Sequence, residues 1–223
     1  MPAGAAKDYG LDRSMIMGYG HDDRCCAFSS LKALLDVKDN DYTSCCILVD
    51  KEEIGSVGAT GAHSLFFENS LMKLIDLLGE NPSILAVRKI YENSKMLSSD
   101  VSAAFDPLYP SVSDTNNAAY FGQGIVFNKY TGRAGKSGSN DANPEYYAFI
   151  RKAMDDANVN WQNSELGKVD QGGGGTIAYI LGNYNMNVID AGIAVLNMHA
   201  PMEIISKVDL YEAYKGYLAF LKA

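Results

Sequence analysis

The sequence predicts an α/β fold in three layers, with a mostly parallel mixed sheet between two layers of helices. Short apolar runs of strand length alternate along the chain with longer segments in which apolar residues recur at helical spacing. Carboxylates or a histidine follow four of these apolar runs, and open α/β sheets bind ligands where their strands end. Neither a repeat nor a linker separates the segments, so we expect residues 1–223 to form a single domain.

The composition restricts the classes of partner. Of the 223 residues, 27 are acidic and 19 are basic, and the formal net charge of −8 disfavours binding to a nucleic-acid backbone. No apolar run reaches the roughly 18 to 20 residues of a membrane span, and the N-terminus lacks a secretory signal pattern, so we expect a cytoplasmic protein without a membrane partner. Two pairs of adjacent cysteines, Cys25 with Cys26 and Cys45 with Cys46, lack zinc-knuckle spacing and are interpreted as core residues in a reducing compartment.

The first predicted strand leads into a helix that begins with two carboxylates. Residues 1–13 carry no helix or strand signal, and residues 14–17 are expected to form a buried strand. Asp22 and Asp23 then fall in the first helical turn, where the macrodipole and capping favour carboxylates. That structural role explains one aspartate readily and a pair less readily. The helix is predicted from an apolar stripe made of Ala27, Leu31, Leu34 and Leu35.

A second predicted strand, residues 45–49, leads to the adjacent carboxylates Glu52 and Glu53. A pair of glutamates at a strand end is suited to metal ligation and proton transfer. A solvated charged turn explains the same pattern without any function. This stretch alone does not separate the two interpretations.

The remaining segments continue the alternation. Residues 131–141 are expected to form a polar Gly-rich loop, whose Gly-Lys-Ser lacks the glycine spacing of a phosphate-binding loop, so a nucleotide site is disfavoured. The glycines at 172–175 either admit a ligand close to the backbone or form a loose turn, and both interpretations stay open. The expected helices are 65–78, 84–91, one from Pro144 onward, 177–181 and 202–221, and the expected strands are 95–101, 124–130 and 188–196, the last leading to His199.

Four predicted strand ends therefore carry candidate ligands. Asp22, Asp100, the glutamate pair and His199 offer oxygen and nitrogen donors that suit two divalent ions of the zinc, cobalt or manganese type. In a two-metal hydrolase, one carboxylate bridges the ions while an unligated glutamate deprotonates the attacking water. Neighbouring side chains at a strand end point in different directions, so Glu52 and Glu53 are expected to divide these two roles.

The residues around these ligands carry a family resemblance. In sequence order the motifs are GHDDR at 20–24, DKEEIGS at 50–56, SDV at 99–101 and MHAPME at 198–203, with GKSGSNDAN at 135–143 as further support. From Leu11 to the C-terminus, the chain resembles the aspartyl aminopeptidase and aminopeptidase I family of dinuclear zinc metallopeptidases, particularly its bacterial aminopeptidase I branch. The resemblance implies the C-terminal part of a zinc-peptidase-like α/β/α catalytic domain that releases N-terminal residues from peptides. It also implies two bound metal ions and a large homo-oligomer.

Carried over position by position, the resemblance implies a role for each candidate ligand. Asp22 would bridge the two metal ions, and Glu52 would be the general base. Glu53 and His199 would complete one metal site, and Asp100 would serve the other.

Substrate contacts are implied less directly. The resemblance places the turn at 172–176 against the substrate, with Gly174, Gly175 and Thr176 as its candidate binding residues. Basic side chains nearby in the sequence are candidates to bind an acidic substrate side chain, although solvated loop cations are the simpler explanation. These basic residues are Lys129, Arg133 and Lys136.

One part of the family pattern is not found in this sequence. Members of the family carry an earlier His-x-Asp motif, whose histidine completes the second metal site, and an inserted second domain. His21 and His63 match that histidine neither by position nor by order. We therefore expect a truncated chain that is inactive or weakly active alone. Two alternatives are a non-catalytic remnant or assembly subunit that needs another polypeptide for the missing motif, and a metal-independent small-molecule binding protein, against which the four motifs argue.

Overall fold

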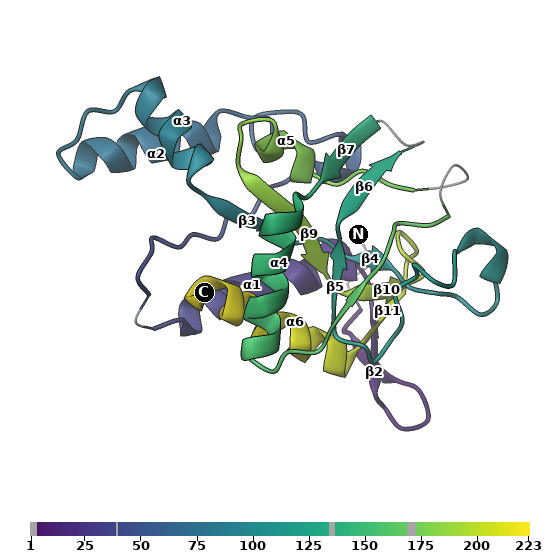
Figure 1. Ribbon diagram of the computed structural model, residues 1–223. Helices are drawn as coiled ribbons and strands as arrows, with labels where there is room; N and C mark the ends of the chain where they lie inside the picture. The colour runs from purple at the N-terminus through teal and green to yellow at the C-terminus, as the bar shows by residue number, and fades with distance from the viewer. Residues whose placement is uncertain (1–3, 39, 134–136, 169–172) are drawn as a thin grey trace.

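A computed structural model describes residues 4–38, 40–133, 137–168 and 173–223 (Figure 1). Within these ranges, no helix combines the length and the apolar character needed to cross a bilayer. The strands are β1 (Lys7–Tyr9), β2 (Met15–Gly18), β3 (Lys95–Ser98), β4 (Ser102–Ala103), β5 (Ile125–Asn128), β6 (Tyr130–Arg133), β7 (Ser137–Asp141), β8 (Trp161–Asn163), β9 (Asn187–Gly192), β10 (Ala194–Leu196) and β11 (Glu203–Ser206). The helices are α1 (His21–Asp36), α2 (Phe66–Leu77), α3 (Ile84–Glu92), α4 (Pro144–Asp156), α5 (Ala178–Gly182) and α6 (Lys207–Lys222), with 3₁₀ turns at Glu52–Ile54 and Pro110–Val112.

The strands form two larger sheets rather than the single parallel-type sheet that the strand ends suggest. One sheet has the order β3-β9-β5-β8 and contains two parallel pairs joined by the antiparallel pair β5–β9. The other has the order β1-β2-β11-β10-β4, and its pairs are antiparallel apart from β10–β4. The chain passes from one sheet to the other between β9 and β10, and β6 pairs with β7 in a separate hairpin. The predicted mixed α/β fold is confirmed, with less parallel pairing than expected.

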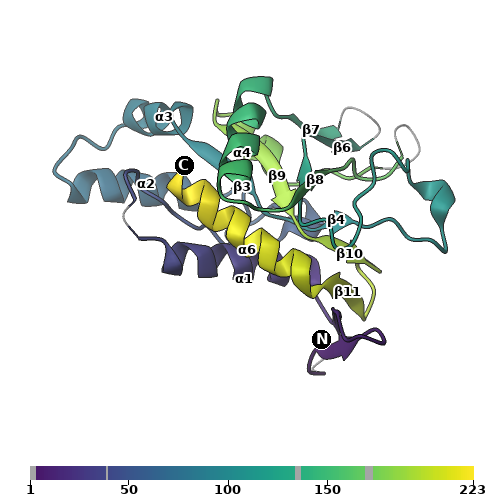
Figure 2. The ribbon, with the colours of Figure 1, turned by 60° about the horizontal axis from the view of Figure 1, so that its bottom comes forward.

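Helices cover both faces of the β3-β9-β5-β8 sheet. On one face, α1, α4 and α6 pack over Ile125, Phe127 and Ile189, which belong to the main buried core. On the other face, α5 contacts β9 and shares a second buried cluster with α2 and α3 around Val188. Successive residues of β9 therefore enter different cores, because side chains alternate across a strand. Figure 2 shows α6 running beside α1, which it contacts.

Local sequence signals explain where several helices begin and end. Ser83 accepts a hydrogen bond from the Ala86 N–H at the start of α3, and Asn143 accepts one from the Tyr146 N–H at the start of α4. The chain after α2 turns at Gly79, whose φ of 79° is a left-handed conformation that glycine adopts without strain.

The predicted strand at 45–49 is wrong. These residues are all described, and they pair with no strand in the described part of the chain. Leu48 is 57% exposed, and Cys45 is exposed as well, so the core interpretation holds for Cys25 and Cys26 but not for Cys45. An apolar run has the composition of a strand, but a strand also requires a neighbour that completes its hydrogen bonds.

Other predicted elements are shifted. The loop expected at 131–141 contains the β6–β7 hairpin, and the helix expected from Met202 begins at Lys207 because 203–206 form β11. The short strands β1 and β8 were not predicted. Leu31 and Leu35 are exposed, and α1 instead buries a face made of Cys25, Cys26, Ser29 and Ala33.

Candidate metal centre

Three of the predicted metal ligands meet at one point. His199 Nε2 lies 2.9 Å from Asp22 Oδ2 and 3.2 Å from Glu53 Oε1. One donor atom from each of the three residues lies within 4.8 Å of the other two. The Asp22 side chain is only 9% exposed, whereas those of His199 and Glu53 are 61% and 57% exposed. We call these residues the trio: one covered carboxylate beneath two donors that face solvent.

The five-stranded sheet brings Asp22 and His199 together, although they lie near opposite ends of the chain. β11 lies between β2 and β10 and runs antiparallel to both, so both of these strands end at the edge where β11 begins. Asp22 follows β2, and His199 follows β10. Glu203, the first residue of β11, pairs with Gly18 at this edge and accepts hydrogen bonds from the N–H groups of Asp22 and His199.

The glutamate pair lies on a 3₁₀ turn rather than at the end of a strand. Lys51, before the turn, has a left-handed φ of 71°, and its carbonyl accepts a hydrogen bond from the Ser56 N–H at 2.8 Å. Successive side chains of a 3₁₀ turn point about 120° apart. Glu53 therefore reaches His199, while Glu52 points in a different direction from the same turn.

Burial and mutual repulsion raise the pKa of the carboxyl groups at this site. Burial first, and then the charge of Glu53, raise the pKa of Asp22 to about 6, although His199 opposes the shift. Burial and the charges of Glu53 and Asp22 likewise raise the pKa of Glu52. Carboxylates held together in this way are stabilised by a bound cation, which removes the repulsion.

Asp100 is half-buried, and its donor atoms are not part of the trio. Burial first, and then the charge of Asp23, raise the pKa of Asp100 well above its ordinary range. Burial and the neighbouring Cys26 raise the pKa of Asp23 to about 11, and Asp23 Oδ1 is buried without a hydrogen-bond partner among the described residues. A Cβ at Gly192 would lie 1.5 Å from the Asp100 carbonyl oxygen, so only glycine lets β9 pass Asp100 at this distance.

The predicted substrate-binding turn is joined to β9 through Asp190. The Thr176 hydroxyl donates a hydrogen bond to Asp190 Oδ1. Thr176 is 7% exposed, so its side chain faces the interior. Asp190 is in turn close enough to Glu52 to contribute to the raised pKa of that glutamate. Gly174 is half-buried and Gly175 is exposed, which leaves the backbone of the turn as its accessible part.

The predicted basic residue Lys129 is not part of the trio. Lys129 Nζ lies 2.5 Å from Asp141 Oδ1, and the two side chains are 40% and 64% exposed. Lys136 and Gly172, which belong to the predicted basic and glycine segments, lie outside the described residues, and so does the side chain of Arg133.

Two buried acids beside the site, Asp190 and Glu203, had no predicted role. Both are 2% exposed, and each belongs to a strand whose other residues are buried, apart from Asn187 at the start of β9. An acid inside an apolar strand needs hydrogen-bond partners, because a buried unpaired carboxylate is costly. That pattern is the sequence signal that identifies them.

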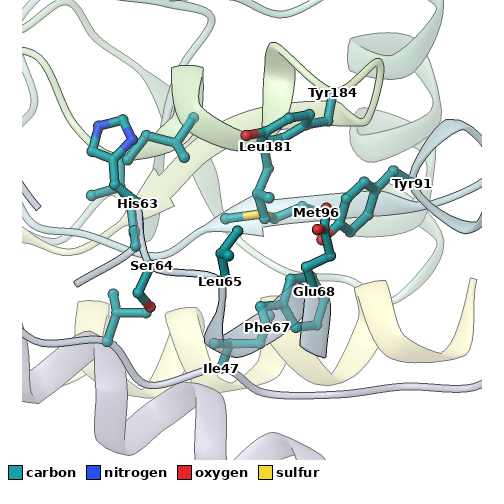
Figure 3. Close-up of a pocket in the computed structure, with 14 residues that line it drawn as sticks. Ile47, His63, Ser64, Leu65, Phe67, Glu68, Tyr91, Met96, Leu181 and Tyr184 are labelled. Atoms are coloured by element: carbon teal, nitrogen blue, oxygen red, sulfur yellow. The ribbon is translucent and has the colours of Figure 1, made fainter. Parts of the chain in front are cut away.

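An apolar pocket of about 80 Å³ lies beside the loop that carries the glutamate pair (Figure 3). Ile47 lines it from the segment that precedes the pair. Figure 3 shows Leu65 near the middle of the pocket, with Glu68 and Tyr91 on one side and His63 on the other. The lining contains no member of the trio, so the pocket and the metal centre are separate features.

The donors of the trio fit an ion of the zinc type. Imidazole nitrogen and carboxylate oxygen are common zinc ligands, and three protein ligands with one open position are typical of catalytic zinc sites. The solvent-facing side of His199 and Glu53 leaves room for that open position. This fit concerns one ion, and Asp100 is the candidate ligand of a second.

Comparison with known proteins places the chain in a family. The family of aminopeptidase I zinc metalloproteases, M18, matches residues 1–221. The chain belongs to the M18 family. The resemblance seen in the sequence motifs is thereby confirmed. This M18 chain is 62% identical over 221 residues to a probable M18 family aminopeptidase 1 of Clostridium acetobutylicum, a match that covers 99% of this chain and 47% of that protein.

Solved structures agree with this assignment. The crystal structure of aminopeptidase I from Clostridium acetobutylicum superposes with a TM-score of 0.92 at 62% identity, covering 100% of this chain and 47% of that one. The M18 aminopeptidase from Thermotoga maritima superposes with a TM-score of 0.96 at 43% identity, covering 99% of this chain and 49% of that one. The M18 chain thus spans about half the length of the curated relatives that it matches.

Proposed function

We propose that this M18 chain forms a metal-dependent aminopeptidase site that releases N-terminal residues from peptides. The observation that carries the proposal is the trio, in which three donor atoms lie within 4.8 Å of one another beside Glu52. Membership of a zinc metalloprotease family supports zinc as the ion. Residues 1–223 would act together as one domain.

Each residue would have a defined role in this reaction. Asp22, Glu53 and His199 would hold one divalent ion, and Asp100 would serve a second, with zinc first and cobalt or manganese as substitutes. Bound ions would polarise the scissile carbonyl and lower the pKa of a water molecule. Glu52 would take the proton of the attacking water and deliver it to the leaving amine. A general base works best with a pKa near the working pH, and the raised pKa of Glu52 supports this role.

The substrate would lie along the Gly-rich turn. Gly174 and Gly175 would offer backbone groups to the peptide, and Thr176 would hold the turn through Asp190. Lys129 would bind an acidic substrate side chain when it is released from Asp141. We also propose the cytoplasmic location expected from the sequence, and a large homo-oligomer, for which the family resemblance is the support. Light scattering would measure the assembly.

Glu52→Gln tests the proposed base. The change keeps the shape of the side chain and removes its proton acceptor. We expect the hydrolysis of short peptides to fall at least about 100-fold, while the zinc content per chain stays unchanged. Glu92→Gln, at an exposed position of α3, is the matched control and should have no effect. Hydrolysis by Glu52→Gln at the wild-type rate would contradict the assigned role.

The activity of the unmodified chain is a separate prediction. We expect weak turnover or none from the chain alone, because the trio accounts for the ligands of one ion and only Asp22 and Asp100 are assigned to the second. Assays with added zinc, cobalt or manganese measure it. Turnover comparable to that of ordinary peptidases would contradict this expectation and leave the metal-site proposal intact.

A further inference from the structure

Glu203 connects the two metal ligands that come from opposite ends of the chain. The Asp22 N–H donates to Glu203 Oε2 at 2.9 Å, and the His199 N–H donates to Glu203 Oε1 at 2.8 Å. The Glu203 side chain is 2% exposed. Each carboxylate oxygen is therefore used by the backbone of one trio member, in an environment with little competing water.

The strand that carries Glu203 makes this connection rigid. Glu203 pairs with Gly18 in the ladder between β11 and β2, and the next residues, Ile204 and Ile205, are buried. β11 also pairs with β10, so the carboxylate stands between the ends of both neighbouring strands. A side chain on a central strand is positioned more accurately than one on a loop.

The backbone at His199 needs such support. His199 has a φ of 66°, and Asn197 has a φ of 58°, both in the left-handed region that residues with a Cβ seldom adopt. Such conformations persist where surrounding contacts hold them. The hydrogen bond from the His199 N–H to a carboxylate is of the strong, charge-assisted kind.

We propose that Glu203 is a positioning residue of the metal centre. It fixes the backbone of Asp22 relative to that of His199. The side-chain atoms of these two residues that would bind the ion are therefore already close together before an ion binds. Glu203 is not itself assigned as a ligand, because the three converging donors are those of the trio. The inference rests on the proposed metal-binding function, and it concerns affinity and geometry rather than a step of the reaction.

Asp209 provides a matched control within the same chain. It is fully buried, and its two oxygens accept hydrogen bonds from the N–H groups of Gly122 and Gly124, both at 2.8 Å. The arrangement is the same as at Glu203, but Asp209 joins the start of α6 to the loop before β5 and contacts no trio member among its recorded hydrogen bonds. Any general effect of losing a buried carboxylate that accepts hydrogen bonds from backbone N–H groups should therefore appear when either Glu203 or Asp209 is replaced.

The test compares Glu203→Gln with Asp209→Asn in the full chain. Each amide keeps one acceptor and turns an NH₂ group toward the other backbone N–H. Cobalt(II) titration, followed by visible absorption, gives the dissociation constant and the ligand-field spectrum, and thermal unfolding of the metal-free protein gives the effect on stability. We expect both variants to lower the melting temperature, but only Glu203→Gln to weaken cobalt binding, by about 10- to 100-fold, and to shift the spectrum.

A second readout does not depend on any metal. Hydrogen exchange of the Asp22 and His199 amides in the metal-free protein should be faster in Glu203→Gln and unchanged in Asp209→Asn. If Glu203→Gln does not fold, Glu203→Asp replaces it, because a side chain shorter by one methylene cannot reach both amides, and the same results are expected. Wild-type cobalt affinity and spectrum in the folded Glu203 variant would overturn the inference. If the wild-type chain binds no cobalt, the proposed function fails, and unchanged exchange at both amides would then overturn the role of Glu203.

Discussion

Asp190, which is buried, and Asp23, which is half-buried with a buried Oδ1, have opposite surroundings. The Thr131 hydroxyl donates to Asp190 Oδ2 at 3.2 Å, and the Thr176 hydroxyl donates to Oδ1. Burial raises the pKa of Asp190 only to about 6, because these hydrogen bonds oppose the shift. Asp23 Oδ1 has no partner among the described residues, and burial with the neighbouring Cys26 raises its pKa to about 11.

The comparison distinguishes a carboxylate that the protein itself stabilises from carboxylates whose charge a bound cation would stabilise. Permanent hydroxyl donors stabilise the Asp190 carboxylate, so it can be charged at neutral pH without any ion. The cluster of Asp22, Asp23 and Asp100 contains mutually repelling carboxyls, which the positive charge of a divalent ion would stabilise. Substitutions at Asp190 and substitutions in the cluster should therefore have different effects on metal affinity and on the pH dependence of stability.

The largest expected effect is on metal affinity. Asp22→Asn removes the covered carboxylate of the trio, and we expect zinc or cobalt affinity to fall more than about 1000-fold, or about 4 kcal/mol, because even residues that only support a ligand contribute 10- to 100-fold. Asp190→Asn should change the affinity less than about threefold. Chelator competition measures both constants. Equal affinities of Asp22→Asn and wild type would remove the distinction between the carboxyl cluster and Asp190.

Asp23→Asn should abolish a pH dependence of the metal-free protein. The pKa of Asp23 is higher in the folded state than its ordinary 3.8, so the folded state binds more protons and stability falls as the pH rises above about 4. At pH 7 the free energy of unfolding is lowered by about 4 kcal/mol, and the variant should recover up to this amount at that pH. Urea unfolding with a chelator, between pH 4 and 8, measures it. Parallel curves of stability against pH for wild type and variant would show that the fold does not raise the pKa of Asp23.

Asp190→Asn should abolish a smaller dependence in a narrower window. The pKa rises from 3.8 to about 6 in the fold, so the stability difference between wild type and Asp190→Asn should change between about pH 4 and pH 6 and then level off. The difference corresponds to about 3 kcal/mol. The same unfolding series detects it. If the difference between the two curves keeps changing up to pH 8, Asp190 resembles Asp23 instead.

Gly192→Ala should have the smallest effect, on the backbone that passes Asp100. The added Cβ would meet the Asp100 carbonyl at 1.5 Å, so the strand must shift, and we expect a loss of about 2 kcal/mol in unfolding free energy. Gly216→Ala is the control, because the nearest atoms there belong to side chains rather than backbone, Ile125 Cδ1 at 3.1 Å and Met154 Sδ at 3.3 Å. Equal stabilities of the two variants would show that the approach at Gly192 is not tight.

Local sequence was sufficient for much of the fold. The helices α2, α3 and α4 follow from their apolar periodicity, and Asn143 with Pro144 indicates where α4 begins. The candidate ligands Asp22, Glu53 and His199 were found because acids and a histidine follow apolar runs in ordered motifs. Residue identity and local spacing carry this information directly.

Tertiary structure alone decided which runs pair and which ligands meet. Residues 45–49 have the composition of a strand but no ladder partner in the described chain, whereas 203–206 form a strand inside a predicted helix. The meeting of Asp22 with His199 depends on β11 lying antiparallel between β2 and β10, with Glu203 at the shared edge. Such pairing joins residues far apart in the chain, and its stability comes from cross-strand contacts and burial, which no local window of sequence contains.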